Sequence, residues 1–306
     1  MKIPTGPYAA FKLPDFRLFV SARFCITLAI QVQSVVVAWQ VYELTHDPLS
    51  LGLIGLAEAI PSIGVSLYAG HIADVVQRKK IILFCLTTLL LCSAALLFFT
   101  LDAGKFLLSY GVASIYTVIF ISGIARGFLT PALFAYMPQL VPRELYTNAI
   151  TLNSTLWEAA AIGGPALGGF LYGFFGVRAS YAADVCLMLA GLSLAMGINN
   201  KPLPPESEEQ GIVEKIKAGL RFVFHNQIIL GAISLDLFAV LFGGAVALLP
   251  IFAKDILHAG PEALGLLRAA PSVGAVMMAF YITHNPIRKN TGRVLLYAVG
   301  GFGICM

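Results

Sequence analysis

The strongest constraint on this chain is a series of long apolar stretches that follow one another along nearly all of its 306 residues. A helix needs about 20 mostly apolar residues to cross the hydrocarbon core of a bilayer. Apolar residues make up 58% of the chain and charged residues only 12%, about half the usual charged fraction. The sequence therefore predicts an all-α integral membrane protein. We expect the start of a ninth span at 294–306 and eight complete transmembrane helices at residues 17–44, 49–73, 81–101, 107–130, 147–175, 178–198, 228–253 and 262–283.

The basic residues indicate the orientation of the chain, because cytoplasmic segments of membrane proteins carry an excess of Lys and Arg. With the N-terminus in the cytoplasm, fourteen Lys and Arg fall in the predicted cytoplasmic segments and only three, Lys105, Arg178 and Lys254, fall outside. The net charge of +4 thus follows from topology and does not indicate a nucleic-acid partner. We expect a multi-pass membrane protein with a cytoplasmic N-terminus.

An internal repeat accompanies the apolar stretches. Residues 55–64 read GLAEAIPSIG and residues 265–274 read GLLRAAPSVG, so six of ten positions are identical at an offset of 210 residues. Arg78 and Lys79 fall on Arg288 and Lys289 at the same offset. Repeated halves with the binding site between them are typical of secondary transporters.

The repeat predicts three parts in the chain. Residues 1–198 form a six-helix N-terminal half, residues 199–227 a cytoplasmic linker with an amphipathic helix, and residues 228–306 an incomplete C-terminal half. Apolar residues of the linker recur at helical spacing among charged ones, which is typical of a helix that lies on a membrane surface. Doubling the repeat predicts a protein of about 400–420 residues, of which this sequence is expected to be a part.

Three short motifs lie on particular spans. The loop between the second and third spans carries Gly70, Asp74, Arg78 and Lys79. The fourth span contains Arg126, and the fifth contains a glycine-proline segment made of Gly163, Gly164, Pro165, Gly168 and Gly169.

These motifs resemble those of the major facilitator superfamily. The loop is similar to the family signature Gly-x-x-x-Asp-Arg-x-Gly-Arg-Arg/Lys, although Val75 and Gln77 replace a basic residue and a glycine. The glycine-proline segment resembles a motif of exporters and antiporters. The run that begins at Trp39 and reads WQVYELT is similar to the branch that includes siderophore (enterobactin) and drug exporters.

The resemblance implies a major facilitator fold of two pseudo-symmetric six-helix halves, and roles for the motif residues. The loop residues and Arg126 would form a gate, in which Asp74 accepts hydrogen bonds at a helix N-terminus. The glycine-proline segment either lets the fifth span rock against the eighth or provides static close packing.

Ionisable side chains inside spans are costly and mark candidate functional sites. We expect Glu158 and Arg268, on the fifth and eighth spans, to pair in one state and separate in another as Glu158 takes up a proton. Glu58 is the alternative proton carrier, and it occupies the position equivalent to Arg268 in the repeat. Arg23, Asp184 and Asp236 are expected to serve helix contacts or the membrane surface. Three further residues could line a substrate cavity or serve packing: Gln31, Gln33 and Trp39.

Together with the resemblance, these features predict a secondary active transporter that exports a small amphipathic molecule by alternating access. We expect an ion gradient, of protons, to drive it. The alternatives are a nutrient importer or facilitator, or a truncated membrane protein without transport activity. We find no Walker loop, GxSxG or HExxH motif, and the five cysteines form no CxxC pair. We therefore expect no enzymatic activity, no metal and no cofactor; a monomer in the lipid bilayer is expected from the family.

The predicted length can be tested directly. We expect the intact mass of the protein isolated from its native membrane to be about 44 kDa, as a doubled repeat requires. Mass spectrometry of the purified protein measures it, and a mass near the 32.7 kDa of the present sequence would contradict the prediction.

Overall fold

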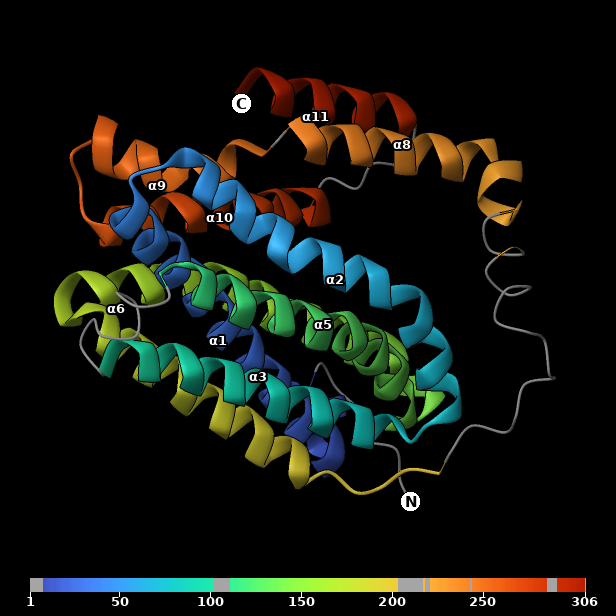
Figure 1. Cartoon of the computed structure of the whole chain (residues 1–306). Coiled ribbons are helices and arrows are strands. Elements are labelled where there is room, and N and C mark those ends of the chain that lie inside the picture. The colour runs from blue at the N-terminus through green and yellow to red at the C-terminus, as the bar shows by residue number, and fades with distance from the viewer. Residues whose placement is uncertain are drawn as a thin grey trace.

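The computed structural model describes residues 8–101, 111–202, 217, 221–242, 244–284 and 291–305, and every regular element in these ranges is a helix (Figure 1). The long helices are α1 (Pro14–Thr45), α2 (Pro48–Val75), α3 (Arg78–Leu101), α5 (Ala113–Tyr136), α6 (Tyr146–Met196), α8 (Gln227–Phe242), α10 (Pro261–His284) and α11 (Thr291–Cys305). Short elements are η1 (Ala10–Lys12), η2 (Met137–Gln139), η3 (Arg143–Leu145), η4 (Gly244–Leu248), α9 (Leu249–Ile251) and the π-helix η5 (Phe252–Ile256).

The first five long helices form one bundle. Helix α1 packs mainly along α6, α2 packs along α5, and α3 packs against both α5 and α6. Helix α10 lies along α6, whereas α8 and α11 lie side by side at the edge of the bundle (Figure 1). Six helices in the described residues are long and apolar enough to cross a membrane, and many large apolar side chains on them are exposed, as a lipid-facing surface requires.

Helix α6 covers two of the predicted spans. Its 51 residues would extend about 75 Å as a straight helix, more than twice the hydrocarbon thickness of a bilayer. The helix breaks at Gly176, where φ is +81°, a conformation that residues with a Cβ rarely adopt. The two predicted spans, 147–175 and 178–198, therefore correspond to the two sides of this break.

The predicted span 228–253 differs from the structure. Helix α8 ends at Phe242 after 16 residues, and the chain continues through η4, α9 and η5 instead of one helix. Two glycines, Gly243 and Gly244, follow Phe242 in the sequence, and glycine is unfavourable in a helix interior. Pro250 lies farther on, at the start of α9, where a proline is tolerated. The count of eight complete spans is thus not confirmed.

The repeat has a structural counterpart in α2 and α10. Pro61 lies inside α2 and Pro271 lies inside α10, at equivalent positions of the two repeated segments. Arg288, Lys289 and most of the predicted linker helix lie outside the described residues, so the division of the chain at 198 and 227 stays a prediction.

The glycine-proline segment brings α6 close to two helices. A Cβ at Gly168 would lie 3.0 Å from the Cα of Val32 on α1, and a Cβ at Gly169 would lie 2.8 Å from the Cα of Gly265 on α10. The segment therefore packs against α1 on one side and α10 on the other, as small residues allow in membranes. Rocking of α6 against α10 stays a prediction.

The close α6–α10 contact predicts a position-specific effect on stability. A Cβ at Gly265 would lie 2.6 Å from the Pro165 carbonyl oxygen, so we expect Gly265→Ala to lower the free energy of unfolding by about 1–3 kcal/mol through overpacking. Gly274, on the same helix, has nothing within 4 Å of its Cβ position, and Gly274→Ala should change stability by less than about 0.5 kcal/mol. Unfolding in detergent micelles measures both, and equal effects would contradict the prediction.

Candidate functional site

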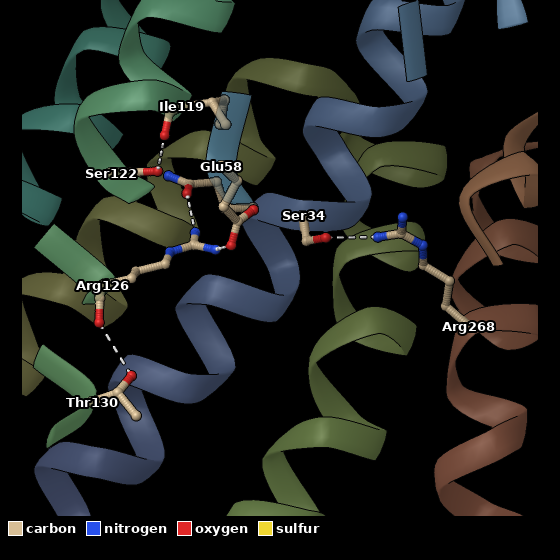
Figure 2. A network of polar contacts seen from close by, with 8 residues as sticks. Ser34, Glu58, Ile119, Ser122, Arg126, Thr130 and Arg268 are labelled. Atoms are coloured by element: carbon tan, nitrogen blue, oxygen red, sulfur yellow. Dashed lines mark hydrogen bonds and ion pairs between the residues drawn. The ribbon is translucent and has the colours of Figure 1, made fainter. Parts of the chain in front are cut away.

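An ion pair lies in the middle of the helix bundle. The Arg126 guanidinium on α5 donates through Nη1 to the Glu58 carboxylate on α2. Figure 2 shows the two side chains pointing toward one another. The Arg126 side chain is 15% exposed and that of Glu58 is 40% exposed, so the carboxylate is the partner that remains reachable from outside the bundle.

Two glycines of α5 make this pair possible. A Cβ at Gly123 would lie 2.5 Å from the Glu58 carbonyl oxygen, and a Cβ at Gly127 would lie 2.9 Å from the Ser62 carbonyl oxygen. Because these glycines have no side chain, the α5 backbone lies close to the α2 backbone both before and after Arg126. The close approach fixes where the Arg126 side chain meets α2.

A buried polar network extends from the ion pair into the bundle. Arg126 Nη2 donates to Gln33 Oε1 on α1 at 3.1 Å. Gln33 Nε2 in turn donates to Ser93 Oγ on α3 and to Asp184 Oδ2 on α6, each at 3.1 Å. Gln33 is 2% exposed and Asp184 is fully buried. Five helices thus meet in one chain of hydrogen bonds.

The network is not fully satisfied. Among the described residues, Asp184 Oδ1 and Arg126 Nε are buried without a hydrogen-bond partner. Buried polar atoms without partners are rare and each calls for an explanation. In this conformation the network therefore leaves one carboxylate oxygen and one guanidinium nitrogen unpaired inside the bundle.

Two cavities meet at the ion pair. The larger, of about 640 Å³, is lined by Glu58 and Arg126 together with polar and apolar residues of α1, α5 and α6, among them Arg23, Gln31, Asn153 and Trp157. The smaller, of about 140 Å³, lies toward the other end of the molecule and is also lined by Glu58 and Arg126, with Gln33, Ser34, Leu51 and Arg268. The ion pair therefore separates a wide cavity from a narrow one.

The predicted pair of Glu158 and Arg268 does not form in this conformation. Arg268 Nη1 donates to Ser34 Oγ on α1 at 2.7 Å (Figure 2). Glu158 is half-buried on α6 and makes no ion pair among the described residues. Pairing in another state of the protein stays a prediction.

The other cavity candidates separate into two groups. Gln31 lines the larger cavity, whereas Trp39 is 4% exposed and packs in an apolar cluster with Val35 and Leu264. Trp157 lines the larger cavity and is accessible. Asp236 is exposed on α8, and Arg23 donates to Asn153 Oδ1 at 3.0 Å.

The loop between α2 and α3 is held by helix C-termini. Arg78 Nε donates to the Ala73 carbonyl at 3.1 Å and Nη1 to the Ala135 carbonyl of α5 at 2.8 Å. Lys79 donates to the Met196 carbonyl at 2.9 Å. Cations are stabilised at such carbonyl ends of helices. Gly70 has nothing within 4 Å of its Cβ position, and the side chain of Asp74 lies outside the described residues, so its gating role stays a prediction.

A polytopic membrane transporter of the major facilitator superfamily is the class that this helix order, repeat and central charged cavity define. The family model described as "Transmembrane secretion effector" matches residues 5–306. The chain belongs to this family of the superfamily, and it is a multi-pass membrane protein rather than an enzyme.

Curated relatives and solved structures agree with this assignment. The enterobactin exporter EntS of Salmonella choleraesuis is 26% identical over 291 residues, which are 94% of this chain and 68% of that protein. EntS of Citrobacter koseri is 27% identical over 267 residues, 87% of this chain and 62% of that protein. The chain thus spans about two thirds of these relatives.

Solved transporters share the fold. The D-xylose–proton symporter matches with a TM-score of 0.61 at 15% identity, over 90% of this chain and 69% of that one. The POT family transporter PepTSo matches with a TM-score of 0.51 at 15% identity, over 88% and 55%.

The network predicts different roles for two glutamines of α1. Gln33→Ala removes donors and acceptors from buried Asp184 and Arg126, so we expect it to lower the free energy of unfolding by about 1–3 kcal/mol. Gln31→Ala, in the wall of the open cavity, should change it by less than about 0.5 kcal/mol. Unfolding of both variants in the same detergent measures the difference, and a similar loss for both would contradict a special role of Gln33.

Proposed function

We propose that the protein is a secondary active transporter that exports a small amphipathic molecule in exchange for protons by alternating access. The observation that supports it most is the cavity of about 640 Å³ with the Glu58–Arg126 ion pair in its wall. Its lining combines apolar side chains such as Ile26 and Leu133 with charged groups, a combination suited to an amphipathic ligand. The similarity to enterobactin exporters supports export of a siderophore-like or drug-like cargo.

Glu58 is the proton carrier that the geometry favours. It is ionisable, reachable from the cavity and paired with a single guanidinium group. A proton on its carboxylate would end the ion pair and leave Gln33 as the partner of Arg126. The other charged groups around it are Arg126, Arg268 and, beyond Gln33, Asp184. Protonation of Glu58 would thereby change a hydrogen-bond network that joins five helices.

The wide cavity lies at one end of the molecule. It is lined by the early part of α1, the last part of α5 and the first part of α6, at the end of the molecule that the basic residues place in the cytoplasm. We propose that the present conformation is open toward the cytoplasm, in the inner membrane of a bacterium, where the proton gradient drives the exchange without any bound cofactor. The protein functions as a monomer in this proposal.

A flux assay tests the function. The intact protein in proteoliposomes, with enterobactin as the probe, should accumulate the probe against its gradient when a pH gradient is imposed, and a protonophore should abolish this accumulation. We expect Glu58→Gln to reduce pH-driven accumulation to the level of protein-free liposomes while exchange of labelled for unlabelled probe continues, because the variant cannot take up the coupling proton.

The controls separate the alternatives. Glu144→Gln, at an exposed position of η3 before α6, should behave like the natural protein. Loss of coupling in Glu158→Gln with intact coupling in Glu58→Gln would transfer the proton role to Glu158. Flux that the protonophore does not change would identify an importer or facilitator instead. If neither enterobactin nor lipophilic cationic dyes are transported, the proposal of a transporter is contradicted.

A further inference from the structure

Glu58 and Arg268 occupy equivalent positions in the two repeats. An offset of 210 residues relates Glu58 to Arg268, as it relates Pro61 to Pro271 in the same helices. Within otherwise similar segments, an acid thus stands in one repeat where a base stands in the other. Opposite charges at symmetry-related positions are suited to meet at the interface between the repeats.

The structure places both side chains at one cavity. Glu58 of α2 and Arg268 of α10 line the same cavity of about 140 Å³, together with Ser34 and Gln33 of α1. Figure 2 shows Arg268 directed from α10 toward Ser34, with Glu58 and then Arg126 farther along in the same direction. The Glu58 carboxylate therefore has one guanidinium group on each side, and it binds that of Arg126.

Arg268 is poorly satisfied where it lies. Its one hydrogen bond in the described chain is the one to Ser34, and its Nε is buried without a partner. No ion pair neutralises it among the described residues. A cation in the interior of a membrane protein is costly without a counter-charge, and Glu58 is the carboxylate that shares its cavity.

We propose, on the basis of the function proposed above, that Arg268 is a second partner of Glu58, and that the Glu58–Arg268 ion pair holds α2 and α10 together at the narrow-cavity end of the molecule. The carboxylate alternates between Arg126 within its own repeat and Arg268 in the other repeat. Only the pair with Arg268 joins the two repeats. Protonation of Glu58, or its binding to Arg126 as in the present conformation, removes this ion pair. The narrow-cavity end is then closed only by the packing around Ala38 and Leu51, and it opens more easily.

The proposal requires opposite effects of two similar substitutions. Arg268→Gln removes the contact between the repeats, so the narrow-cavity end should open more often. Arg126→Gln leaves Arg268 as the remaining guanidinium partner of the Glu58 carboxylate, so the narrow-cavity end should stay closed. In a Glu58→Gln background neither substitution has a carboxylate to act through, and both effects should disappear.

Two single-cysteine reporters in a cysteine-free background of the intact protein measure this without any transport. Ala38 lines the narrow cavity and is 5% exposed, so Ala38→Cys reports opening of that end. Ser154→Cys, in the lining of the wide cavity, reports the other end. The rate of labelling with a membrane-impermeant maleimide in proteoliposomes is the observable.

We expect Arg268→Gln to raise Ala38→Cys labelling and to lower Ser154→Cys labelling, each at least about twofold, as coupling between contacting residues implies. Arg126→Gln should shift both reporters the opposite way. Arg178→Gln is the matched control, because Arg178 donates to the Thr100 carbonyl and lines neither cavity. It should leave both rates unchanged.

Shifts in the same direction for both arginine variants, or shifts that persist in the Glu58→Gln background, would overturn the ion pair. If Arg268→Gln does not give monodisperse protein, Glu58→Gln replaces it, because it removes the same ion pair and must raise Ala38→Cys labelling. A correct labelling pattern without proton-driven flux would uphold the ion pair and overturn the proposed function alone.

Discussion

The buried charge of Arg126 is the constraint on which the N-terminal helices depend. A guanidinium group inside a membrane bundle is tolerated only with polar partners around it, and the chain supplies them from Glu58 on α2 and Gln33 on α1. Gln33 extends the same network to Asp184 on α6 and Ser93 on α3. The hydrogen bonds around one cation therefore join five helices, and a change in the partners of Arg126 alters the contacts among all of them.

Close packing and the polar network depend on each other. Gly123 and Gly127 bring the α5 backbone against α2, and only at that separation does Arg126 meet the Glu58 carboxylate. On the opposite side of the bundle, Gly168 and Gly169 bring α6 against α1 and α10 in the same way. Because lipid offers no hydrophobic driving force between helices, such contacts and interhelical hydrogen bonds provide the association.

The sequence predicted the helical class, most helix positions and the locations of the motifs, because span length and glycine spacing are local properties. It did not predict which buried charges meet. Glu158 and Arg268 were expected to pair from their depth alone, yet depth does not specify how a helix is rotated, and Arg268 faces Ser34. Asp184 was expected to serve helix contacts, and its place in the Arg126 network depends on the packing of α1, α3 and α6. The end of α8 had a local signal in Gly243 and Gly244, but the apolar run around them predicted one continuous span.

One carboxylate between two arginines cannot neutralise both. Whichever guanidinium group Glu58 binds, the other retains a buried and incompletely satisfied charge, as the unpartnered Nε atoms of Arg126 and Arg268 indicate. Packed interfaces have a few discrete arrangements rather than a continuum, so in the proposed mechanism this competition gives two arrangements, one for each ion pair. A repeat that carries an acid in one copy and a base in the other would provide the competition between the two repeats, as alternating access requires.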